Sequence, residues 1–122
     1  MTRPVVLDPG LLLRAALGPA GRPPLEAWRD GQIRPVLTRR TLAHALGLLR
    51  EAGLSRSTLE RWALWLSDSQ KVLILPDGDP GLTMREEHVD AARRAEASIL
   101  TDQPGDFGAA TGLVVEKPAS PA

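Results

Sequence analysis

The chain has 122 residues, a length that fits one domain and is sufficient to bury a hydrophobic core without disulfide or metal staples. It contains no cysteine, which excludes disulfides and thiolate metal sites. Its 15 basic residues balance its 15 acidic residues, so it lacks the strong overall positive charge typical of many nucleic-acid-binding proteins. No apolar run reaches the about 18 residues of a membrane span, and the first residues pass directly into a strand-like run instead of a signal-peptide core, so we expect a cytoplasmic protein.

The first half of the chain alternates short apolar runs with amphipathic segments. Gly18 and Pro19 end the first helical segment, and Thr38 is the expected N-cap of a later helix that stops before Gly53. The elements predicted in this half are a strand over residues 4–7, a helix over 10–17, a helix over 23–28, a strand over 33–37 and a helix over 38–52.

The second half repeats this alternation, with Ser55 or Ser57 as the N-cap of its first helix. Strands that alternate with helices favour a parallel sheet covered by helices on both faces, an α/β fold with about five strands. We expect a single domain over residues 1–117 and a disordered tail over 118–122. The elements predicted in this half are a helix that ends at 66, a strand over 72–75, a loop over 76–81, a helix over 82–96, a strand over 98–101, a short helical turn over 104–110 and a strand over 112–116.

Acidic residues follow two of the predicted strands. Asp8 ends the first apolar run, Asp102 and Asp106 come after the run at residues 99–100, and the helix ahead of that run carries Glu86 near its start. In open α/β folds the ligand crevice lies outside the carboxyl ends of the strands, so acids at these places can converge on one site. Such a cluster of oxygen ligands predicts a site for a hard divalent cation such as Mg²⁺.

Two segments of the chain also resemble a known family. Residues 5–49 resemble an opening in which a strand ends in Asp-Thr-Asn and is followed by a helix, a Gly/Pro-rich turn and a helix-strand-helix unit. Residues 88–118 resemble a closing helix, a strand, a Thr-x-Asn-x-x-Asp-Phe segment and a final strand, and the residues that take the spacing of that segment are Thr101, Gln103, Asp106 and Phe107. In this order the segments resemble a PIN domain, of the type found in the toxin components of bacterial toxin-antitoxin systems.

The resemblance implies a PIN-like three-layer α/β/α domain that acts as a metal-dependent endoribonuclease. In such enzymes three or four acids hold Mg²⁺ or Mn²⁺, which neutralises the scissile phosphate and lowers the pKa of the attacking water. The implied partners are RNA, an antitoxin-like protein and a second copy of the chain in a homodimer, with no membrane. The implied metal ligands and catalytic residues are Asp8, Glu86, Asp102 and Asp106, and the sequence leaves open whether Asp102 or Asp106 is the fourth acid.

Two positions depart from the family pattern. Gly10 stands where an Asn is usual, and His44 stands where the second acid, a Glu, is usual. A neutral imidazole is a poorer ligand for Mg²⁺ than a carboxylate, although it suits Mn²⁺, Zn²⁺ or Ni²⁺. The sequence therefore leaves three functions open. The first is a ribonuclease with a weakened catalytic site, and the second is a catalytically inactive PIN-like module that binds RNA or a protein. The third is a module that binds a small ligand at the same crevice.

Each candidate acid also has a purely structural explanation. Asp8 precedes a helix and can cap it, and Glu86 sits in the first turn of a helix, where the helix dipole favours acids. Asp102 and Asp106 fit turns or caps. Trp65 is interpreted either as a core residue or as part of a dimer interface. The arginines that can meet phosphates or simply solubilise the middle helices are Arg39, Arg40, Arg50, Arg56 and Arg61.

Overall fold

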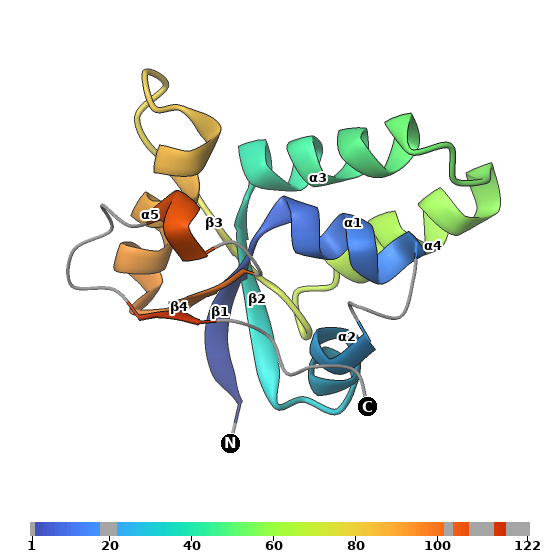
Figure 1. The fold of residues 1–122 in the computed structure, drawn as a ribbon, viewed down its shortest axis with the longest axis horizontal. Coiled ribbons are helices and arrows are strands. Elements are labelled where there is room, and N and C mark those ends of the chain that lie inside the picture. Colours follow the sequence, from blue (N-terminus) through green and yellow to red (C-terminus); the bar gives the residue numbers. More distant parts are fainter. Residues whose placement is uncertain (1, 18–21, 102–103, 108–113, 117–122) are drawn as a thin grey trace.

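The fold is a three-layer α/β/α sandwich with a parallel sheet at its centre (Figure 1). A computed structural model of the chain describes residues 2–17, 22–101, 104–107 and 114–116. The strands pair in the order β3-β2-β1-β4-β5. They are β1 (Arg3–Leu7), β2 (Ile33–Thr38), β3 (Leu73–Leu75), β4 (Ser98–Leu100) and β5 (Val115–Glu116). The helices are α1 (Pro9–Leu17), α2 (Arg22–Arg29), α3 (Arg39–Glu51), α4 (Arg56–Leu66) and α5 (Met84–Ala95), with a 3₁₀ helix, η2 (Pro104–Phe107), between β4 and β5.

This architecture confirms the fold class predicted from the alternation of strands and helices. Each predicted element has a counterpart within a few residues, and the predicted loop over 76–81 connects β3 to α5. The predicted last strand is described only over Val115–Glu116, and the tail predicted over 118–122 lies outside the described residues. Among the described residues, no helix is long and apolar enough to cross a membrane.

The sheet buries a different set of side chains on each face, because successive residues of a strand point to opposite sides. In β1, Val5 and Leu7 belong to one core cluster and Val6 belongs to the other. The first cluster packs the sheet against α1, α2, α3 and α4, and the second packs it against α5 and η2. All three β1 side chains are 2% exposed or less, so this strand is buried on both faces.

Three helices begin at hydroxyl side chains that accept a backbone N–H. Thr38 caps α3 and Ser55 caps α4, so the first predicted N-cap is confirmed and the open choice between two serines falls on Ser55. Thr83 caps α5, and its reciprocal bond with Glu86 forms a capping box. The helix therefore begins at Met84, two residues later than predicted.

The aromatic side chains of α2 and α4 pack against each other inside the chain. Trp65 stacks on Trp28 with ring centroids 4.0 Å apart, and Trp62 lies 5.6 Å from Trp65. The indole N–H of Trp28 donates to the backbone carbonyl of Lys71 at 3.1 Å. Trp65 is therefore half-buried against the core. A homodimer stays a prediction.

Candidate functional site

Asp8 lies at the carboxyl end of β1, in the middle of the sheet. The register of β1 with β4 pairs Leu7 with Leu100, which brings Thr101 beside Asp8. The Thr101 hydroxyl donates to Oδ2 of Asp8 at 2.7 Å, and the backbone N–H of Gly10 donates to Oδ1 at 3.3 Å. The Asp8 carboxylate is thus held in place from two sides, and the bond from Gly10 gives it the capping role at the start of α1.

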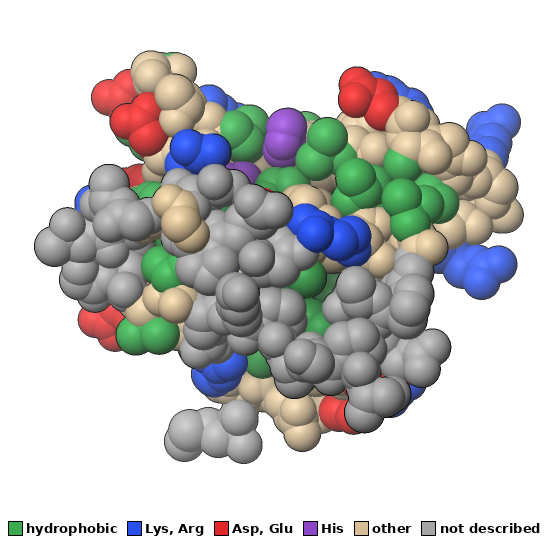
Figure 2. Space-filling view, viewed as in Figure 1, with side chains coloured by type: hydrophobic (Ala, Val, Ile, Leu, Met, Phe, Trp, Pro, Cys, Tyr) green, Lys and Arg blue, Asp and Glu red, His purple; other side chains and the backbone are tan. Residues whose placement is uncertain are grey.

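A pocket of about 270 Å³ opens at this edge of the sheet. It lies where the start of α1, the middle of α3, the start of α5 and η2 come together. In Figure 2, histidine atoms reach the surface between hydrophobic side chains and a basic side chain in this region. The described residues that line it are Asp8, Pro9, Gly10, His44, Leu48, Met84, Arg85, His88 and Phe107.

The chain contains only two histidines, and both of them line this pocket. His88 is 3% exposed, and its Nδ1 lies 2.7 Å from the backbone carbonyl of Met84. Burial lowers the pKa of His88, against the opposing effects of the Met84 carbonyl and the Asp8 and Glu87 carboxylates, while His44 adds to the lowering. The ring is therefore neutral at pH 7, with the proton on Nδ1 and an unprotonated Nε2.

A buried ion pair fixes the start of α5 and with it one wall of the pocket. The Glu87 side chain is completely buried, and its Oε1 lies 3.2 Å from the Arg40 guanidinium. Its other oxygen accepts the backbone N–H of Gly78 at 3.0 Å. Arg40 also donates to the carbonyl of Leu82 at 2.8 Å and to that of Asp79 at 3.3 Å. These bonds tie the loop before α5 to the first turn of α3.

Of the two predicted acids whose side chains the structure describes, Asp8 and Glu86, one lines the pocket and the other does not. Asp8 lines the pocket, whereas Glu86 is exposed and accepts the backbone N–H of Thr83 at 2.9 Å, and the bonds to Thr83 lower the Glu86 pKa. Asp102 lies outside the described residues. Asp106 belongs to η2, and its side chain also lies outside the described part of the chain.

The start of α5 contributes Met84, Arg85 and His88 to the pocket in place of Glu86. Residues at i and i+4 share a helix face, whereas Glu86 lies about half a turn from His88. The four residues from Thr83 to Glu86 match the capping-box pattern, a Thr followed three residues later by a Glu, so the sequence did carry a signal for the capping role.

The described residues form no complete set of metal ligands. Within the part of the chain that the structure describes, no group of three or more His, Asp or Glu side chains is arranged to hold a metal ion. Asp8 is the single carboxylate among the described lining residues, and both of its oxygens accept hydrogen bonds from the protein. Mg²⁺ is usually held by one or two carboxylates, with water and phosphate oxygens completing its octahedron, and the described residues supply one such carboxylate.

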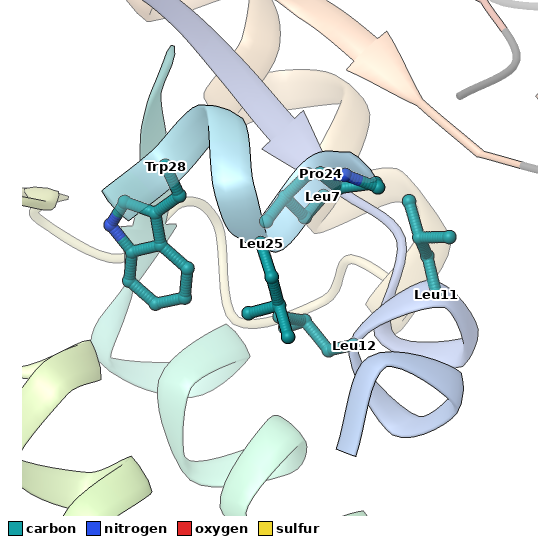
Figure 3. Close-up of a pocket in the computed structure, with 6 residues that line it drawn as sticks. All are labelled: Leu7, Leu11, Leu12, Pro24, Leu25 and Trp28. Atoms are coloured by element: carbon teal, nitrogen blue, oxygen red, sulfur yellow. The ribbon is translucent and has the colours of Figure 1, made fainter. Parts of the chain in front are cut away.

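A second, much smaller hollow lies between β1, α1 and α2 (Figure 3). Its lining is entirely apolar, and Leu12 of α1 and Leu25 of α2 point toward each other across it. Its volume of about 10 Å³ is at the lower limit for one water molecule, and an apolar space of that size is a packing void. It therefore takes no ligand.

Comparison with protein-family models found no family that matches the chain, and comparison with curated proteins found no matching relative.

Proposed function

We propose that this chain is a PIN-like domain that binds single-stranded RNA at the pocket beside Asp8, and that metal-dependent hydrolysis is weak or lost in it. One observation carries the proposal: among the described lining residues, Asp8 is accompanied by two imidazoles and the Arg85 guanidinium, with no second carboxylate. The pocket lies at the carboxyl edge of the sheet, where open α/β folds bind ligands, and its described lining carries one carboxylate and one guanidinium.

This described lining favours binding over hydrolysis. A phosphodiester is an anion, and a guanidinium attracts it, whereas the neutral His88 imidazole does not repel it. Arg85 is exposed at the start of α5, where it remains accessible to a phosphate. Arg40, by contrast, is engaged with Glu87 and the loop before α5, so it is not available for phosphate contacts.

Fluorescence anisotropy with a labelled single-stranded RNA tests the binding proposal. We expect binding in the presence of EDTA, an affinity that falls as salt rises, and weaker binding by Arg85→Ala. Arg56→Ala is the matched control, because Arg56 is exposed on α4 and forms an ion pair with Glu60. RNA binding that is undetectable in low salt, or equally weakened by both substitutions, would contradict the proposal.

The metal-dependent ribonuclease with Asp8, Glu86, Asp102 and Asp106 remains a second candidate. It is favoured by the bond from Thr101, which fixes the Asp8 carboxylate at the pocket. Calorimetric titration with Mg²⁺ and Mn²⁺, together with an RNA cleavage assay, separates the two functions. Cleavage that requires the cation and is abolished by Asp8→Asn would establish the nuclease, and His44→Glu would then raise the Mg²⁺ affinity because it adds a carboxylate near the ion.

A further inference from the structure

The pocket contains a hydrogen-bond acceptor that the protein leaves unused. A carbonyl oxygen only accepts, so the 2.7 Å bond to Met84 requires Nδ1 of His88 to carry the proton. In the neutral ring Nε2 is then an acceptor with a free lone pair, and no hydrogen bond to it is formed within the described part of the chain.

This nitrogen faces the pocket. His88 lines the pocket although the residue is 97% buried. Its Nδ1 is engaged with the Met84 carbonyl, so Nε2 is the ring nitrogen left to meet a ligand there. A ligand in the pocket therefore meets an acceptor that is held rigidly by the bond to Met84.

The surroundings of this acceptor select the chemistry of the ligand. A phosphate oxygen has no proton to donate, and the Asp8 carboxylate on the same pocket repels it. A neutral hydroxyl donates to Nε2 without either cost. The apolar side chains of Leu48, Met84 and Phe107 suit the sugar or base around such a hydroxyl, and Arg85 suits a neighbouring phosphate.

We propose that Nε2 of His88 accepts a hydrogen bond from the 2′-hydroxyl of one RNA nucleotide, and that the pocket thereby distinguishes RNA from DNA. The inference rests on the proposed RNA binding and adds the group that is recognised. The 2′-hydroxyl is the donor that RNA has and DNA lacks. The pocket volume of about 270 Å³ suits one nucleotide and excludes a duplex, so the ligand is an unpaired nucleotide of a single strand.

The test compares a short single-stranded RNA with DNA of the same sequence and with a 2′-fluoro version, which is similar in size to the hydroxyl but has no proton to donate. We expect the protein to bind RNA about two- to tenfold more tightly than either analogue, the range of a single neutral hydrogen bond. His88→Asn keeps an N–H that can reach the Met84 carbonyl and removes Nε2, so it should bind all three strands with equal affinity. His44→Asn, the matched control at the other pocket histidine, should retain the preference for RNA.

The outcomes separate this inference from the proposed function. Absence of binding to any of the strands would overturn both, whereas equal binding of RNA and DNA by the unaltered protein would overturn only the role of His88. A preference for RNA that persists in folded His88→Asn would also overturn it. If His88→Asn does not fold, a series of RNAs with one 2′-deoxy nucleotide at successive positions decides: loss of affinity at a single position supports the inference, and no loss at any position refutes it.

Discussion

The ion pair between Arg40 and Glu87 should be the polar interaction whose loss costs most stability. Arg40→Met removes the guanidinium and keeps a long apolar side chain. The substitution leaves the fully buried Glu87 carboxylate without its cation and also deletes the bonds to the carbonyls of Asp79 and Leu82. We therefore expect the loop before α5 to loosen together with the first turn of that helix.

The structure sets the size of the effect. Removing one partner of a buried ion pair costs about 3–5 kcal/mol. The Arg40 side chain is 28% exposed, so solvent screens part of the interaction, and the backbone N–H of Gly78 still binds the other Glu87 oxygen. Both facts place Arg40→Met near the lower limit, about 3 kcal/mol, out of a total of about 5–15 kcal/mol for a typical domain. Glu87→Gln keeps an oxygen for Gly78 and should cost less, about 1–2 kcal/mol.

Urea denaturation followed by far-ultraviolet circular dichroism measures these costs. The double variant Arg40→Met/Glu87→Gln should lose less stability than the sum of the single variants, because an amide without its cation is not an uncompensated buried charge. Arg56→Met is the control, since its partner Glu60 is exposed and such a pair contributes about 0.5 kcal/mol or less. The reasoning is refuted if Arg40→Met and Arg56→Met lower the free energy of unfolding equally.

Three further predictions concern stability and are measured by urea denaturation. Trp65→Ala should lower the free energy of unfolding by about 2–3 kcal/mol, since its ring stacks on Trp28. Leu64→Ala, at a side chain that is 75% exposed, should change it by less than about 0.5 kcal/mol. Equal losses in the two variants would contradict this packing. Gly78→Ala should destabilise by about 1–3 kcal/mol, because a Cβ would lie 2.9 Å from the buried Glu87 carboxylate oxygen. Gly47→Ala, in open space on α3, should stabilise by about 0.5–1 kcal/mol. No loss of stability in Gly78→Ala would show that the Glu87 carboxylate moves freely. The pKa of His88 is lowered in the folded state, so the unfolded chain binds the proton more readily. The contribution of His88 to stability should therefore be complete above about pH 6.5 and be lost as the pH falls through the folded-state pKa. His88→Asn should remove this part of the pH dependence.

Most of the fold was predictable because it depends on local patterns. Apolar runs and helical periodicity located every described element, and Thr38 was recognised as an N-cap from its own residue type. The sequence predicts a parallel sheet but not the order of its strands, because the order and register depend on which strands pair. The ion pair of Arg40 with Glu87 could not be predicted, because its partners are 47 residues apart and belong to different helices.

The candidate site was predictable in place but not in composition. The carboxyl end of β1 directed attention to Asp8, and the structure does place a pocket there. The resemblance implies Glu86 as a site residue, whereas the α5 residues that line the pocket are Met84, Arg85 and His88. A shift of two residues reverses the face of a helix, which sequence order alone cannot resolve. His44, noted as a replacement for an acid, does line the pocket.

The clustering of the tryptophans has a consequence for spectroscopy. The chain has three tryptophans and no tyrosine, and all three indoles lie within 6.4 Å of one another by centroid distance. The cluster is bonded to Lys71 ahead of β3, at the amino end of a parallel sheet whose carboxyl end carries the pocket. Near-ultraviolet signals and intrinsic emission therefore report on one end of the molecule, and a ligand or a local opening at the other end leaves them almost unchanged. A dye placed near the pocket would supply the missing signal, and a difference between the two signals would measure how far the ends unfold independently.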